Sequence, residues 1–129
     1  MRIKSHRDLK VYKKAFGAAM GVFELSKKFP KEETYSLTDQ FRKSSRSVCS
    51  NLAEAWLKRR YEAAFTCKLT DCQGEAAETQ TWIEFAVKCR YMSHEEGLVL
   101  FKTYDEVLGI LVSVIHQPQK WLLPRSKIP

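Results

Sequence analysis

The chain has 129 residues, of which 44% are apolar, so it has the size of one domain and is too apolar to be disordered. Its 22 Lys and Arg against 15 Asp and Glu give a net charge of +7. No stretch approaches the roughly 20 apolar residues of a membrane helix, and no charged segment followed by an apolar one opens the chain as a leader would. We therefore expect a cytoplasmic protein without membrane association.

The first predicted helix spans about residues 5–28. Apolar residues recur there at intervals of three and four, which is typical of one helical face. Ser5 with Asp8 fits a capping box at its start, and Pro30 ends it. The apolar positions are Leu9, Tyr12, Phe16, Ala19 and Phe23.

Three further helices are predicted at about residues 36–58, 60–91 and 93–116, followed by a tail, 117–129. Capping pairs mark the first and last of these helices. Three adjacent cations interrupt the pattern between the first two and place a turn there. The capping pairs are Ser36 with Asp39 and Ser93 with Glu96, and the turn residues are Lys58, Arg59 and Arg60.

Short connections force neighbouring helices to run antiparallel, and each apolar stripe must be buried against the others. The sequence therefore predicts an all-α fold, an antiparallel up-down four-helix bundle, as a single domain over residues 1–129.

The positive charge is concentrated at the start of the chain, since residues 1–31 hold nine Lys and Arg against Asp8 and Glu24. A basic stripe favours a polyanionic partner such as RNA, although a solubilising surface has the same composition. Aromatic residues for base stacking are few, with only Tyr12 and Tyr61 close by. The candidate nucleic-acid-binding residues are Arg7, Lys10, Lys13, Lys14, Lys27, Lys28 and Lys31 on the first helix and its flanks, and Lys58, Arg59 and Arg60 at the turn.

A polar cluster is predicted between the second and third helices. If these helices fold back around Arg59, residues equally distant from it meet, and basic residues face acidic ones in half-buried ion pairs. Losing one partner of such a pair costs about 3–5 kcal/mol, so Glu75→Ala should destabilise the fold. A carboxylate active site is the alternative interpretation. The cluster comprises Arg42, Arg46, Asn51, Glu54, Glu75 and Glu78, with Lys43 beside them.

Gly17 and Gly21 lie in the middle of the first predicted helix, where each costs about 1 kcal/mol relative to Ala. Close approach of another backbone is the usual reason for such a residue. The neighbour is either the fourth helix of the same chain or a helix of another subunit, and we favour an oligomer contact.

No arrangement of residues indicates catalysis. A di-metal bundle needs Glu-x-x-His motifs, which are absent, and a hydrolase needs a base near its nucleophile, which Ser47, Cys49 and Ser50 lack. The cysteines fit reduced, partly buried thiols. We expect no enzyme activity, metal, cofactor or small-molecule substrate. The histidines, all near predicted helix ends, are His6, His94 and His116.

Several segments resemble the 23S ribosomal RNA intervening-sequence protein family. Residues 47–55, SVCSNLAEA, are similar to the family's Ser-Ile-x-x-Asn-Ile-Ala-Glu-Gly, although Ala55 replaces the usual Gly. The resemblance covers about residues 6–116 and implies a four-helix bundle, often a homopentameric ring, without catalysis. The other segments are RDLKVY at 7–12, FP at 29–30, ETYSLTDQFRK at 33–43 and GEAAET at 74–79.

A related bundle protein assists the reverse transcriptases of diversity-generating retroelements and resembles a basic scaffold for nucleic acid and protein. By this analogy the expected function is a non-enzymatic homo-oligomeric scaffold that binds RNA through its first helix and the turn. The alternative is a structural or protein-interaction oligomer with no nucleic-acid role. A filter-binding assay at rising salt distinguishes them, because binding by charge alone is salt-sensitive.

Overall fold

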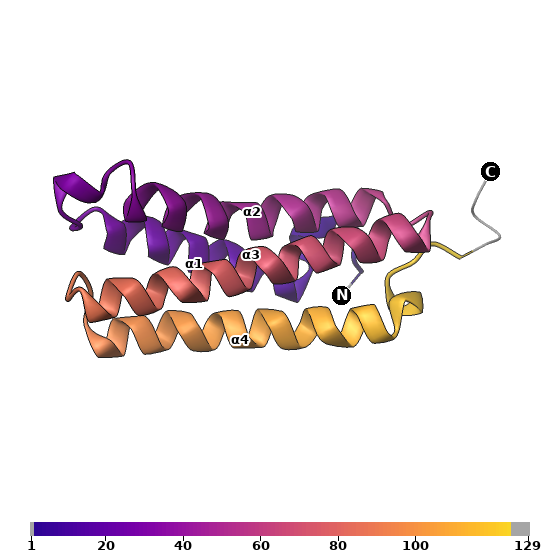
Figure 1. The fold of residues 1–129 in the computed structure, drawn as a ribbon. Helices are drawn as coiled ribbons and strands as arrows, with labels where there is room; N and C mark the ends of the chain where they lie inside the picture. Colours follow the sequence, from indigo (N-terminus) through magenta and orange to yellow (C-terminus); the bar gives the residue numbers. More distant parts are fainter. Residues whose placement is uncertain (1, 125–129) are drawn as a thin grey trace.

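The computed structural model describes residues 2–124, and the predicted tail beyond Pro124 lies outside them. Four long helices lie side by side (Figure 1), and the described residues include no strand. The predicted all-α four-helix bundle is confirmed. The helices are α1 (Lys10–Ser26), α2 (Leu37–Leu57), α3 (Glu62–Lys88) and α4 (His94–His116), with short 3₁₀ turns η1 (His6–Asp8), η2 (Lys31–Glu33) and η3 (Pro118–Lys120).

Neighbouring helices run in opposite directions. Thr79 donates a hydrogen bond of 2.8 Å to Ser44, and the Cys72 thiol lies 3.7 Å from the Val48 carbonyl oxygen, so positions rise along α2 as they fall along α3. The main packed pairs are α1 with α2, α2 with α3, α3 with α4, and α4 with α1. This arrangement places α1 and α3 on opposite corners of the bundle (Figure 1).

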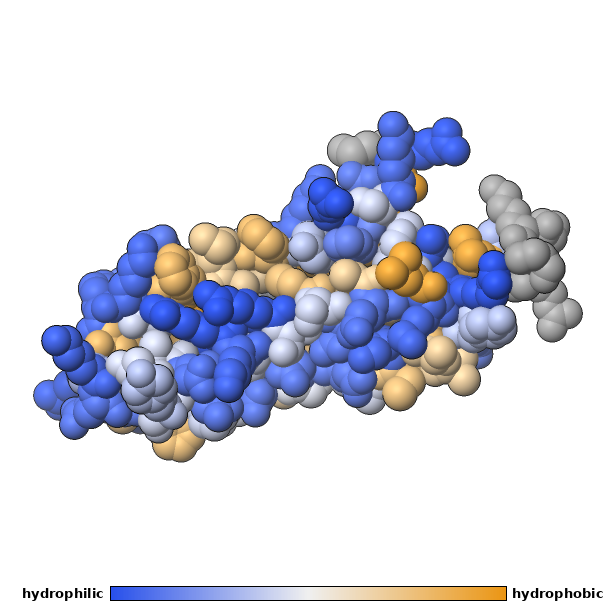
Figure 2. Space-filling model, turned by 90° about the horizontal axis from the view of Figure 1, so that it is seen from above, coloured by the Kyte–Doolittle hydropathy of each residue, from blue (hydrophilic) through white to orange (hydrophobic). Residues whose placement is uncertain are grey.

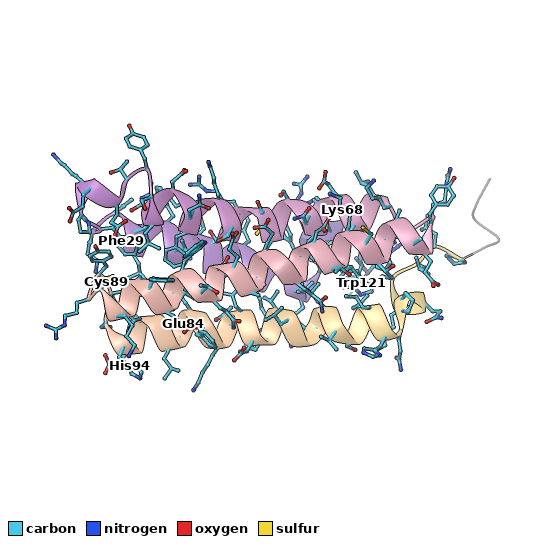
Figure 3. The ribbon with its side chains drawn as sticks, viewed as in Figure 1. Phe29, Lys68, Glu84, Cys89, His94 and Trp121 are labelled. Carbon is cyan, nitrogen blue, oxygen red and sulfur yellow. The ribbon has the colours of Figure 1, made fainter. Side chains whose placement is uncertain are left out.

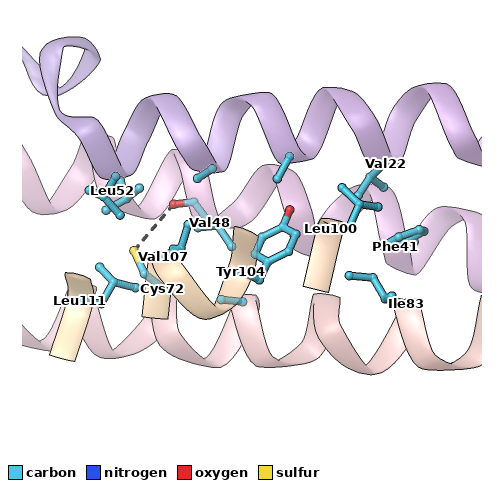
Figure 4. Packing of buried hydrophobic residues seen from close by; sticks show 14 of the residues in the cluster. Val22, Phe41, Val48, Leu52, Cys72, Ile83, Leu100, Tyr104, Val107 and Leu111 are labelled. Atoms are coloured by element: carbon cyan, nitrogen blue, oxygen red, sulfur yellow. Dashed lines mark hydrogen bonds between the residues drawn. The ribbon is translucent and has the colours of Figure 1, made fainter. Parts of the chain in front are cut away.

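The core fills the space between all four helices (Figure 4). Its largest fully buried side chains include Phe41 of α2, Phe65 of α3 and Tyr104 of α4, each 0% exposed. Burying a large apolar side chain contributes about 1.5–3 kcal/mol, so the amphipathic stripes supply the main stabilisation. The Tyr104 hydroxyl has no hydrogen-bond partner among the described residues, and burial raises the pKa of Tyr104.

The first helix is shorter than predicted. Ser5 and Asp8 do form a capping box, but it caps η1 rather than α1. Leu9 then adopts an extended backbone (φ −69°, ψ 133°), and α1 begins at Lys10. The Asp8 carboxylate accepts hydrogen bonds from the backbone amides of Lys4 and Ser5, at 2.8 and 3.2 Å, and these bonds lower the pKa of Asp8.

The two other predicted capping pairs differ in outcome. Ser93 and Glu96 form the expected capping box of α4. The Ser36 side chain makes no capping hydrogen bond. Instead, the Glu33 carboxylate of η2 accepts from the Leu37 amide at 3.3 Å, because the preceding 3₁₀ turn places a carboxylate at the positive end of α2.

Helix α3 ends at Lys88, before the predicted position 91. Arg90 adopts a left-handed backbone (φ 63°), its amide donates to the Val87 carbonyl, and the Tyr91 amide donates to the Ala86 carbonyl at 2.8 Å. These bonds define a Schellman motif. Its left-handed position is usually glycine, so Arg90 does not mark this turn in the sequence.

Candidate nucleic-acid interface

The up-down topology collects the positive charge at one end of the bundle. The start of α1, the α2–α3 turn and the end of α4 all lie in the same half of the bundle (Figure 1). This end, residues 2–14, 54–68 and 106–124, carries eleven Lys and Arg against four Asp and Glu. The rest of the described bundle, residues 15–53 and 69–105, carries nine against eleven. We call the first group the basic end; it holds an excess of seven positive charges.

Five of the predicted cations at the basic end are exposed. None of them forms an ion pair within 4.0 Å with any residue that the structure describes. Their side chains face solvent and are free to meet an anion. These residues are Arg7, Lys10 and Lys13 before and on α1, and Lys58 and Arg60 at the turn.

Three predicted lysines are already paired within the chain. Lys14 forms an ion pair with Glu106 of α4, which lowers the pKa of Glu106. Lys27 lies 3.2 Å from Glu24, and Lys28 lies 3.7 Å from Glu96. Lys27 and Lys28 also follow the opposite end of α1, so they belong outside the basic end, as does Lys31 in η2.

Arg59 holds the segment after α4 against the bundle and does not project into solvent from the α2–α3 turn. Its guanidinium lies 3.4 Å from the centre of the Trp56 ring and donates to the carbonyl oxygens of Trp56 and Trp121, at 2.7 and 3.4 Å. The Leu123 amide donates back to the Arg59 carbonyl at 3.3 Å. Desolvation lowers the pKa of Arg59. Trp121 closes the end of the bundle beside Phe65 (Figure 3).

The predicted ion pairs of Arg42 and Arg46 are wrong. Both guanidinium groups lie over the Phe23 ring of α1, at 5.0 and 5.9 Å from its centre. Arg42 Nε also donates to Ser26 Oγ at 2.8 Å. Both arginines therefore lie on the α1 side of α2, away from the acidic residues of α3, and Lys43 pairs instead with Asp39 at 3.0 Å.

Lys68 of α3 is the cation that reaches across to α2 (Figure 3). Its ammonium lies 3.1 Å from the Glu54 carboxylate, 3.8 Å from Asp71 and 3.3 Å from the Asn51 side-chain oxygen. The hydrogen bond to Glu54 is the main reason that the pKa of Lys68 is raised. The predicted residues Asn51 and Glu54 do meet a cation there, and the periodicity search missed Lys68 because it is polar and half-buried.

Glu75 and Glu78 lie without a basic partner within ion-pair distance in the described chain. Desolvation, followed by the charge and hydrogen bond of Glu78, raises the pKa of Glu75. Glu78 therefore disfavours the ionisation of Glu75, which is the reverse of the stabilising role predicted for Glu75.

The two mid-helix glycines have different surroundings. A Cβ atom at Gly21 would lie 3.2 Å from Leu100 Cδ2 of α4, so Gly21 allows α1 and α4 of the same chain to approach closely, and the favoured oligomer contact is not needed to explain it. A Cβ atom at Gly17 would meet nothing within 4 Å. Gly97, which the sequence pattern did not single out, allows α4 to pack closely on α3, because a Cβ there would overlap the Val87 side chain.

An apolar furrow lies along α1 beside α2 (Figure 2). Phe16 and Met20 are 51% and 46% exposed there, because the buried face of α1 is formed instead by Val11, Ala15, Ala18 and Val22. Tyr12 and Phe16 pack against each other with ring centres 5.9 Å apart. The furrow is the largest departure from the sequence analysis, which placed Phe16 in the core.

Two cysteine thiols of the described residues lie in the bundle interior. Burial raises the pKa of the Cys49 thiol to about 11 and that of Cys72 to about 12, which keeps both thiols protonated and poorly nucleophilic. No group of three His, Cys, Asp or Glu residues in residues 2–124 could hold a metal ion. In the same part of the chain, no helix is both long and apolar enough to cross a membrane.

Comparisons with known proteins identify the family. The model of the family described as 23S rRNA-intervening sequence protein matches residues 7–113, which include most of the bundle. The chain belongs to this family. A crystal structure of a protein of unknown function from the S23 ribosomal protein family of Bacteroides thetaiotaomicron has the same fold. Its TM-score is 0.73 at 26% identity, over 81% of this chain and 97% of that one. No curated protein matches the chain.

Proposed function

We propose that this member of the 23S rRNA-intervening sequence protein family is a non-enzymatic homo-oligomer that binds RNA through its basic end. The gathering of positive charge at that end carries the proposal, because the five unpaired cations come from two segments that only the fold brings together. Lys and Arg bind phosphates by releasing condensed counterions, which makes such binding strong at low salt.

The comparisons support RNA as the polyanion. The family's description refers to 23S rRNA, and the solved relative is described as a member of the S23 ribosomal protein family. An oligomer would bring several basic ends to one RNA and raise the avidity without new contacts.

The groove between α3 and α4, remote from the basic end, is the surface that we propose for the subunit contact. It has a volume of about 540 Å³ and includes Leu98, which is 43% exposed. Val99, which follows Leu98 in the chain, is 67% exposed, and Phe85 of α3 is 54% exposed. Contact there keeps the mutually repelling basic ends apart, whereas contact at the basic end would bring like charges together.

Binding of a fluorescent single-stranded RNA, measured by anisotropy at rising salt, tests the proposal. Each cation that contacts a phosphate contributes about 0.7 to the slope of log affinity against log salt for single strands. We expect the double variant Lys58→Ala, Arg60→Ala to weaken binding and to reduce this slope by about 1.4. The matched control is Lys31→Ala, Lys102→Ala, which removes two exposed cations outside the basic end and outside the α3–α4 groove and should leave the slope unchanged.

Equal effects of both double variants would mean that net charge alone matters, and the basic end would then not be the binding site. Absence of RNA binding by the unmodified protein near physiological salt would leave the alternative function, a structural or protein-interaction oligomer.

A further inference from the structure

A hollow opens on α1 beside the basic end, with cations at its rim and aromatic rings in its wall. Its volume is about 390 Å³, within the range of roughly 300–1,000 Å³ found for ligand sites. Arg7 and Lys13 are exposed and have no acidic partner within ion-pair distance in residues 2–124. The lining residues are Arg7, Tyr12, Lys13, Phe16 and Gly17.

A second hollow, also of about 390 Å³, shares Tyr12 and Phe16 with the first. It continues along the groove between α1 and α2 to Phe23 and Arg46. The Phe23 ring is flanked by the guanidinium groups of Arg42 and Arg46. The two hollows therefore form one furrow. Its lining combines aromatic rings with the cations Arg7, Lys13 and Arg46.

We propose that this furrow binds unpaired nucleotides of single-stranded RNA, with a base stacked on Phe16 or Tyr12 and the adjoining phosphates on Arg7 and Lys13. Exposed aromatic rings within a positively charged groove are the features by which proteins hold single strands without sequence preference. The inference rests on the proposed RNA-binding function and names the form of RNA that it recognises.

The charge of the furrow argues against the other occupants. A second copy of the chain would bring its own net charge of +7 to a surface whose rim is already cationic. Duplex RNA satisfies the phosphate contacts, but its paired bases are stacked on each other and cannot reach the Phe16 ring. A single strand supplies both the negative charge and the free base.

Gly17 keeps the first hollow open. Because a Cβ at Gly17 would meet nothing within 4 Å, the glycine serves no packing contact within the chain. A larger side chain at this position would extend into the hollow without displacing the core, so it can block the site and leave the fold intact.

The test compares Gly17→Leu with Gly74→Leu, which adds the same side chain at an exposed glycine of α3, outside the basic end, that also has nothing within 4 Å of its Cβ. Affinities for a single-stranded RNA oligonucleotide and for the corresponding duplex are measured at one salt concentration. We expect Gly17→Leu to weaken single-strand binding about tenfold, as for the loss of one stacked base. Its duplex binding, and both affinities of Gly74→Leu, should equal those of the unmodified protein.

Phe16→Leu is a second variant that keeps an apolar side chain and removes the aromatic ring. It should weaken single-strand binding to a similar extent with the same salt slope, because no phosphate contact is lost. Thermal melting of each variant checks that the bundle is intact.

If both furrow variants bind single strands as tightly as the unmodified protein, the furrow is not the site, although binding by the basic end would still stand. A lower solution mass of Gly17→Leu with unchanged RNA affinity would show that a second copy covers the furrow, and would overturn the inference. If the unmodified protein binds no RNA, the proposed function fails together with the furrow.

Discussion

At the scale of single residues, Arg90 stores strain in the turn between α3 and α4. Its left-handed backbone (φ 63°) costs a residue with a Cβ about 1–2 kcal/mol, whereas glycine adopts this conformation freely. We expect Arg90→Gly to raise stability by about 0.5–1 kcal/mol, since the greater freedom of glycine in the unfolded chain offsets part of the gain. Thermal melting measures the change. Lys88→Gly, inside the end of α3, should lower stability, and equal effects of both would contradict the argument.

Glu75 provides a residue-scale prediction of pH dependence. Its pKa is raised in the folded protein by desolvation and by Glu78. At pH values between the ordinary pKa and the raised one, the folded protein therefore keeps a proton that the unfolded chain has released. The ionised carboxylate therefore destabilises the fold above the folded pKa. Glu75→Gln should raise the melting temperature at pH 7, with the advantage disappearing as the pH falls below the ordinary value of 4.5.

Glu96 is the matched control for Glu75 because its pKa is lowered, mainly by the hydrogen bond from the Ser93 amide. Its stabilising effect is present above its ordinary pKa and is lost as the pH falls through the lowered value. Glu96→Gln should therefore lower the melting temperature at pH 7. If Glu75→Gln destabilises the protein as Glu96→Gln does, then Glu75 has a favourable partner after all.

At the scale of elements, the sequence predicted the four helices because their apolar stripes are long and regular. It failed where a connection depends on one backbone conformation, as at Leu9 and Arg90. It also placed Arg42 and Arg46 on the wrong side of α2. The apolar stripe of α2 determines which face of the helix is buried. The handedness of the bundle determines which side of that face lies next to α1 and which lies next to α3. Periodicity carries no information on that hand.

Arg59 lies in the α2–α3 turn and contacts Trp56 of α2 and Trp121 after α4. Substituting it therefore distinguishes a structural role from a role in RNA binding. Lysine keeps the charge but loses the planar stacking on Trp56 and the fixed donors to Trp56 and Trp121. Arg59→Lys should destabilise the fold by about 1–2 kcal/mol while leaving the RNA affinity of the folded protein unchanged. Arg60→Lys at the exposed neighbour should change neither quantity. A weaker RNA affinity of Arg59→Lys at full folding would restore Arg59 to the binding site.

At the scale of the whole molecule, the sequence located the excess charge on the first 31 residues, but only the fold shows which cations act together. Lys58 and Arg60 join Arg7, Lys10 and Lys13 because the topology returns the α2–α3 turn to the half of the bundle that holds the start of α1. Lys28 is distant for the same reason. The furrow was missed because an apolar stripe marks both core positions and an exposed aromatic surface.

The assembly of the whole molecule follows from the same charge asymmetry. Seven excess charges at one end repel the corresponding end of another copy, so subunits should meet at the nearly neutral remainder, where Leu98 and Val99 are exposed. We expect Leu98→Lys, in the lining of the α3–α4 groove, to lower the solution mass, measured by light scattering, toward the 15.0 kDa of one chain. Val112→Lys introduces the same charge at a position of α4 that is 45% exposed and outside the α3–α4 groove, and should leave the mass unchanged. A lower mass for Val112→Lys alone would place the contact nearer the basic end, and the repulsion argument would then be wrong.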